Sequence, residues 1–116
     1  MTTTLAHLDD VERVRLAAGK SYTEFLRVAS MSAGVYALAA GGEDLLAPHR
    51  EDELYYVVGG KARFRSGAED QSVTAGSLIF VAAGVSHRFY DITENLQVLV
   101  FFAPAESPGV ETPGVN

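Results

Sequence analysis

Two short stretches of this chain decide how it folds: PHREDELYYVVGG at residues 48–60 and GSLIFVAAGVSH at residues 76–87. Each combines β-branched or aromatic residues with glycine, which is typical of short β-strands that end in turns. His49 and Glu53 lie in the first stretch, and His87 ends the second. Two imidazoles and one carboxylate are the ligand set of a small metal site that leaves coordination positions open.

Further β-runs flank both stretches. The expected strands are residues 25–30, 35–39, 54–58, 62–66, 71–74, 78–81, 86–91 and 96–103. Gly59-Gly60 predicts a hairpin turn that returns 62–66 antiparallel to 54–58, since both glycines tolerate positive φ. Residues 93–95 are expected to form a loop. No helical periodicity lasts for about 12 residues, so the pattern predicts an all-β sandwich or barrel.

The length of 116 residues predicts one domain. We expect residues 1–24 to form an N-terminal arm, in which 11–16 fits either a short strand or a helical turn. Residues 25–104 are expected to form the barrel. The tail, residues 105–116, carries two prolines and two glycines and is expected to be flexible.

Composition excludes several classes of site and partner. The chain has no cysteine, which excludes disulfides and thiolate ligands and fits a cytoplasmic protein. Its net charge of −6 argues against a nucleic-acid partner. Lys61, Arg63 and Arg65 alternate, which predicts a solvated strand face, with recognition of an anion as the alternative. No stretch approaches about 20 apolar residues, so no membrane partner is expected.

With these residues in view, the chain resembles the cupins. The two cupin motifs match at seven positions, namely Gly41, His49, Glu53, Gly60, Gly76, Gly84 and His87. Three positions depart from the family pattern: Ala47 replaces the first histidine, Ala82 replaces a proline and Asp91 replaces an asparagine. The resemblance covers roughly residues 30–103 and is closest to small single-domain bacterial cupins.

The resemblance implies a cupin jelly-roll barrel of about 8 to 11 strands in two antiparallel sheets. It also implies that His49, Glu53 and His87 point into the barrel and bind a divalent transition metal, whether Fe, Mn, Ni, Zn or Cu. Ala47 cannot coordinate, so three protein ligands would remain. That set is found in non-haem iron oxygenases and in some zinc enzymes.

Other polar residues near the motifs have competing interpretations. Glu51 shares strand parity with His49 and Glu53, so it is a rival ligand, although a turn would swing it outward. Asp44 is expected in a turn, and Asp52 is expected as a solvated carboxylate. Tyr55 is a candidate general acid, with a core aromatic role as the alternative.

Strand parity also predicts the wall of the barrel. Tyr55 and Val57 share a face with Glu53, and Phe89 shares a face with His87. On the last strand either Leu99 and Phe101 or Val98, Val100 and Phe102 point inward. Arg88, Arg50 and His7 are expected to be exposed. Leu54, Tyr56 and Val58 would face outward, which predicts a homodimer, because exposed apolar patches mark interfaces.

Three functions remain open at this stage. The first is a metal-dependent enzyme that acts on a small organic molecule, of dioxygenase, isomerase or lyase type. The second is a cupin that binds a small ligand without turnover. The third is a metal-free relic that retains the site residues by descent. The sequence leaves the substrate unassigned, since one fold hosts many chemistries.

Overall fold

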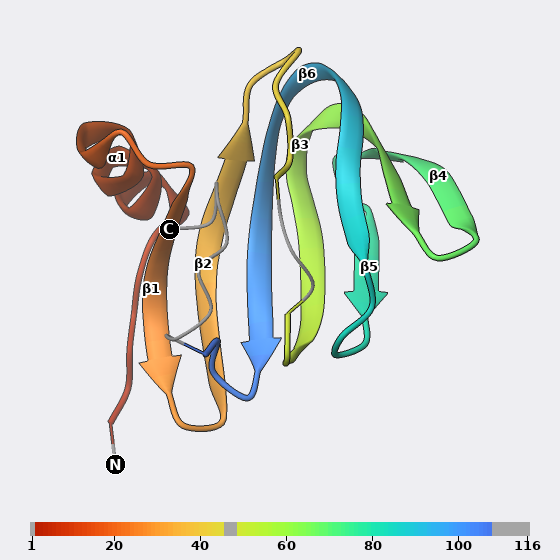
Figure 1. Ribbon diagram of the computed structural model, residues 1–116. Helices are drawn as coiled ribbons and strands as arrows, with labels where there is room; N and C mark the ends of the chain where they lie inside the picture. The colour runs from red at the N-terminus through yellow and green to blue at the C-terminus, as the bar shows by residue number, and fades with distance from the viewer. Residues whose placement is uncertain (1, 46–48, 108–116) are drawn as a thin grey trace.

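The computed structural model describes residues 2–45 and 49–107. In those ranges one helix precedes six strands (Figure 1). They are α1 (Leu8–Ala18), β1 (Tyr22–Val28), β2 (Met31–Leu38), β3 (Asp52–Ser66), β4 (Glu69–Thr74), β5 (Leu78–Val81) and β6 (His87–Ala103). Every strand pairing is antiparallel. The all-β jelly-roll prediction is therefore confirmed.

The two halves of the jelly roll belong to one continuous sheet, because β3 and β6 are long and bend together. The first half of β3 lies between β5 and the end of β6, from Asp52↔Ala103 to Val57↔Val98. Its second half lies between β4 and the start of β6. β4 and β5 do not pair with each other in the described chain, so the sheet is not closed. The expected two sheets are thus two halves of one sheet.

The predicted hairpin at Gly59-Gly60 is wrong. Strand β3 runs through both glycines, and residues 62–66 pair with β4 and β6 instead of with 54–58. The pairing register between β3 and β6 shifts on either side of Gly59-Gly60. Residues 93–95 lie within β6, so the loop predicted there is also wrong. Gly60 has φ +101°, and a Cβ there would lie 2.3 Å from the carbonyl oxygen of Asn95. Glycine is favoured at a bend within a strand as well as in a hairpin turn, because both can require positive φ or close backbone approach.

Alternating side chains of the long strands fill the core. Tyr55 and Val57 of β3 are fully buried, as is Phe89 of β6, as strand parity predicted. On the last strand the inward set is Val98, Val100 and Phe102. The ring of Tyr55 packs edge-on against Phe89 and Phe64, with ring centres 5.1 and 5.9 Å apart. These rings fill the interior instead of lining an open chamber.

The N-terminal region is more ordered than an arm. Residues 11–16 belong to the helix α1, which His7 caps by accepting the Asp9 N–H and which Gly19 ends in a left-handed conformation. Strand β1 begins at Tyr22, three residues before the expected start of the barrel. Val11 of α1 is buried, so the helix packs against the sheet. No helix in the described ranges is long and apolar enough to cross a bilayer.

Candidate functional site

Seven polar side chains are buried among the described residues: Ser32, Asp44, His49, Glu51, Glu53, His87 and Glu106. Six of them are carboxylates or imidazoles, which come from the loop after β2, the loop before β3, β3, β6 and the segment after β6. The seventh, Ser32, lies on β2. Charged side chains are rarely fully buried without a purpose. This concentration marks the candidate site.

His87 is held from both sides. Its Nδ1 lies 2.9 Å from the carbonyl oxygen of Val85. A carbonyl can only accept, so Nδ1 carries the proton and Nε2 of the neutral ring presents a lone pair. Nε2 faces inward, 3.0 Å from the Tyr55 hydroxyl and 2.9 Å from Glu53 Oε1. Burial acts to lower the pKa of His87, but the adjoining Glu53 outweighs burial, and the net shift is upward.

Glu53 is buried almost completely, and its Oε1 has no hydrogen bond to any described group. Glu53 Oε1 lies 2.9 Å from His87 Nε2, and this contact favours the protonated form of His87 and raises its pKa. The Tyr55 hydroxyl donates to that nitrogen. Burial is the main cause that raises the pKa of Tyr55 well above its ordinary value, so this group keeps its proton.

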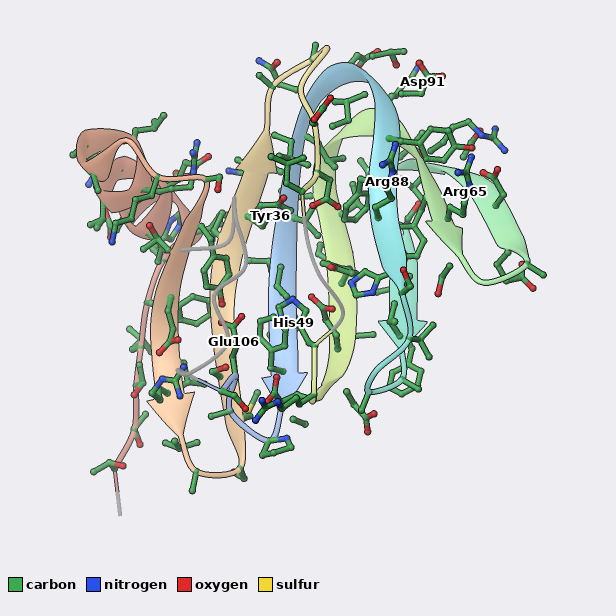
Figure 2. The ribbon with its side chains drawn as sticks, viewed as in Figure 1. Tyr36, His49, Arg65, Arg88, Asp91 and Glu106 are labelled. Atoms are coloured by element: carbon green, nitrogen blue, oxygen red, sulfur yellow. The ribbon has the colours of Figure 1, made fainter. Side chains whose placement is uncertain are left out.

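His49 precedes β3 and is only 4% exposed. Its ring packs edge-on against Phe102, with ring centres 4.8 Å apart. Nδ1 lies 3.5 Å from Glu106 Oε2, and Nε2 has no hydrogen-bond partner in the described part of the chain. Burial lowers the pKa of His49, so the ring is neutral at pH 7. Figure 2 shows His49 and Glu106 at the same end of the barrel.

A small cavity adjoins these groups. Its volume is about 10 Å³. The residues that line it are Tyr22, Tyr36, His49, Glu53, Tyr55, Val100 and Phe102. Three lining residues carry buried polar atoms without a hydrogen bond to another described group: Tyr22 OH, His49 Nε2 and Glu53 Oε1. That space suits one water or one ion.

The donor set fits a metal in type and orientation, but its present spacing is too wide. First-row ions bind nitrogen and oxygen ligands at about 2.0–2.2 Å. Glu53 and His87 converge, whereas the ring centre of His49 lies 6.2 Å from that of His87. Within residues 2–45 and 49–107, no three histidine or carboxylate side chains are close enough to hold one ion.

Two acidic side chains do not lie where the sequence predicted. Asp44 is buried, not in a turn, and accepts hydrogen bonds from the Tyr36 hydroxyl at 2.7 Å and the Phe89 N–H at 2.9 Å. Burial raises its pKa. Glu51 is buried instead of pointing outward, and its Oε2 accepts from the Ser107 N–H at 3.1 Å and the Ser107 hydroxyl at 2.5 Å. Both carboxylates are structural anchors beside the site.

Glu106 is a site residue that sequence reasoning missed. It belongs to the predicted flexible tail, yet residues 105–107 pack against the barrel, and Glu106 is only 6% exposed. Its N–H donates to Ser32 Oγ at 2.9 Å. Burial raises the pKa of Glu106 to about 7. No strand parity reaches past Pro104, so the local sequence carries no signal for this position; the rest of the tail, 108–116, lies outside the described residues.

The remaining candidates lie away from the site or outside the described ranges. His7, Arg50 and Arg88 are exposed, as predicted. The alternating basic residues form an outer strand face: Lys61 pairs with Glu94, Arg63 pairs with Asp70, and Arg65 stacks over Tyr90. Asp52 is exposed and accepts the Ala83 N–H at 2.9 Å. Ala47, where the first cupin histidine is expected, lies outside the described residues.

The cupin-domain family model matches residues 34–102, which run from within β2 to near the end of β6 and include all three metal candidates. The chain belongs to the cupin family. This cupin is also 48% identical over 100 residues to an uncharacterized protein of Streptomyces coelicolor, covering 86% of this chain and 95% of that protein. The expectation of a small bacterial cupin is confirmed.

Solved structures agree on the fold. The cupin is similar to the protein TT1209 of Thermus thermophilus, with a TM-score of 0.74 and 24% identity, covering 89% of this chain and 99% of the other. It is also similar to an RmlC-like cupin of Shewanella frigidimarina, with a TM-score of 0.69 and 22% identity, covering 77% and 79%. At these identities the similarity establishes the double-stranded β-helix architecture alone.

Proposed function

We propose that this cupin binds one divalent transition metal through His49, Glu53 and His87 and acts on a small organic molecule. The observation that supports it is that all three side chains are buried and that two of them, His49 and Glu53, carry a polar atom without a hydrogen-bond partner among the described groups. His87 Nε2 and Glu53 Oε1 lie 2.9 Å apart, and His49 Nε2 is buried with no hydrogen-bond partner among the described groups. Unsatisfied buried donors cost about 1–3 kcal/mol each, so they need a compensating role.

A bound ion would supply Lewis acidity, or redox chemistry if it is iron, manganese or copper. Nickel or zinc are the other candidates. The protein's own contribution is to keep His49 neutral through burial, to hold His87 through the carbonyl of Val85, and to exclude water with the rings of Phe102 and Tyr55. The raised pKa of Tyr55 keeps its hydroxyl protonated, so this group can donate a hydrogen bond to a bound molecule but does not act as a base.

A metal-free role is the second candidate, and one observation favours it. The Tyr55 hydroxyl already donates to His87 Nε2, so in this structure the nitrogen is used as a hydrogen-bond acceptor. The cavity beside it has room for one water-sized particle only. A cupin that binds a small ligand without turnover, or a relic, would keep this closed network.

The test is the metal content of untagged protein purified without chelators. We expect about one Fe, Mn, Ni, Zn or Cu per chain by mass spectrometry, lost in His49→Ala and in His87→Ala. His7→Ala is the matched control, because His7 is exposed and lies outside the site. Tyr55→Phe should keep the metal and lose turnover. Native protein that holds no metal and takes up none of the five ions would support the metal-free role.

We also propose that the cupin forms a homodimer through the outer face of β3 and β5. Leu54 and Tyr56 are 41% and 39% exposed, and their cross-strand neighbours Phe80 and Leu78 are 64% and 72% exposed. The four side chains form one apolar surface. Contiguous surfaces of this kind mark protein interfaces, and a second copy would cover the free edge strand β5 as well.

A further inference from the structure

The segment after β6 forms a strap across the candidate site. Ser107 binds Glu51 through its N–H and its hydroxyl. One residue earlier, the Glu106 N–H donates to Ser32 Oγ, which is completely buried on β2. These three bonds fix the backbone on both sides of the Glu106 side chain. The strap therefore brings a buried carboxylate to a site built by other elements.

The Glu106 carboxylate faces one particular nitrogen. Its Oε2 lies 3.5 Å from His49 Nδ1, and this oxygen has no hydrogen bond to any described group. The opposite nitrogen of the same ring, Nε2, is buried and also unpartnered among the described residues. The ring thus has a carboxylate on its outer nitrogen and a free inner nitrogen beside Glu53.

His87 shows the same arrangement with a different acceptor. Its Nδ1 faces the carbonyl of Val85, and its Nε2 faces inward. In both rings an oxygen atom faces Nδ1, at hydrogen-bond distance in His87 and at 3.5 Å without a hydrogen bond in His49. An acceptor on the outer nitrogen fixes the tautomer and the orientation of a histidine ligand.

We propose that Glu106 is a positioning residue that holds His49 in the Nδ1–H tautomer, so that Nε2 presents its lone pair to the site. The metal-binding part of this inference rests on the proposed function, but the tautomer part does not. Without the carboxylate, His49 Nδ1 loses the oxygen atom that faces it, and the ring proton can move to Nε2, which belongs to the same cavity lining as Glu53. A protonated Nε2 cannot bind a metal.

The experiment reads the tautomer in metal-free protein by ¹⁵N NMR of the imidazole rings. The spectra are recorded at about pH 9, where burial leaves the His49 ring neutral. We expect wild-type His49 to carry its proton on Nδ1. In Glu106→Leu the proton should move to Nε2, while His87 keeps the wild-type pattern. Glu106→Gln, which retains an acceptor oxygen, should restore the Nδ1–H form.

Glu94→Leu is the matched control, because it makes the same change at an exposed glutamate of β6. Zinc affinity gives a second readout: we expect a loss of about 10- to 100-fold in Glu106→Leu and no change in the control. A wild-type His49 protonated at Nε2, or a His49 pattern unaltered in Glu106→Leu, would overturn the proposal. Absence of zinc binding in every variant, with the tautomer shift intact, would instead overturn the proposed function.

Discussion

At the scale of single residues, the buried polar groups divide into anchors and inward donors. Asp44 is the clearest anchor, because both of its oxygens are used, by the Tyr36 hydroxyl and by the Phe89 N–H. It ties the loop after β2 to the start of β6. Glu53 is the opposite case, since its Oε1 is buried without a hydrogen bond to another described group. Asp44 therefore has hydrogen bonds to both of its carboxylate oxygens, whereas Glu53 has one carboxylate oxygen without a hydrogen bond among the described groups.

Asp44→Ala should destabilise the protein by about 2–4 kcal/mol, because it leaves a buried hydroxyl and a buried N–H unpaired. Chemical denaturation followed by circular dichroism measures the loss. Glu43→Ala is the control, since Glu43 is the exposed neighbour and its replacement should change stability by less than about 0.5 kcal/mol. Equal effects of the two substitutions would show that the Asp44 bonds contribute little.

At the scale of elements, the bend of β3 and β6 is what places Glu53 opposite His87. Glu53 lies in the first half of β3 and pairs with β5 and the end of β6, whereas His87 begins β6 in the other half. The halves face each other only because both strands bend at the level of Gly60 and Asn95. The bend therefore matters to the site as much as to the fold.

Gly60→Ala should destabilise the fold by at least about 2 kcal/mol. The new Cβ would lie 2.3 Å from the Asn95 carbonyl oxygen, and the residue has φ +101°. Gly59→Ala is the matched control, because its Cβ would meet nothing within 4 Å. Thermal unfolding of both variants compares them directly. A Gly60 variant as stable as the Gly59 variant would mean that the bend adapts to a side chain.

Docking of α1 should depend on pH through Glu12. Its carboxylate is bound by Arg15 and accepts from Gln97 Nε2 at 2.8 Å, and the bond to Arg15 is the main cause that lowers its pKa below 4.5. A lowered pKa stabilises the fold above the unfolded-state value, and this stability is lost as pH falls through the folded-state value. Wild type should therefore exceed Glu12→Gln in stability at pH 7, and the difference should shrink below about pH 4. Denaturation midpoints at both pH values test this.

At the scale of the whole molecule, two regions are set apart. The polar site lies between the two halves of the sheet, and the apolar outer face of β3 and β5 lies on the opposite side of one half. Glu53 and Leu54 are adjacent on β3, and one is buried while the other is 41% exposed. A dimer through the outer face would leave the interior of each barrel unchanged.

Phe80→Glu should convert the proposed dimer to a monomer, because it places a charge in the centre of the apolar face. Light scattering coupled to size-exclusion chromatography measures the mass directly. Thr74→Glu, an exposed position on β4, is the control and should leave the mass unchanged. A wild-type protein that is monomeric at high concentration would contradict the proposed dimer, and the face would then need another partner.

The sequence by itself determined the fold class and most of the inward-facing set. Period-two alternation from Glu53 to Val57 is a local property of a strand, so the parity of Tyr55 and Phe89 could be predicted without tertiary contacts. The resemblance to cupins predicted a shared metal site of His49, Glu53 and His87, and that site stays a prediction: Glu53 and His87 lie 2.9 Å apart, whereas the ring centres of His49 and His87 are 6.2 Å apart.

Only the tertiary structure decided three other features. Gly59-Gly60 suits a hairpin or a bend equally, and the choice depends on the pairing of β3 with β6 far along the chain. The parity of the last strand was settled by which side of β6 meets the opposite half of the sheet. Glu106 joined the site because Ser32 and Glu51 hold its segment, and contacts at such sequence separation leave no local pattern. Local propensity acts over a few residues, whereas burial is a property of the assembled barrel.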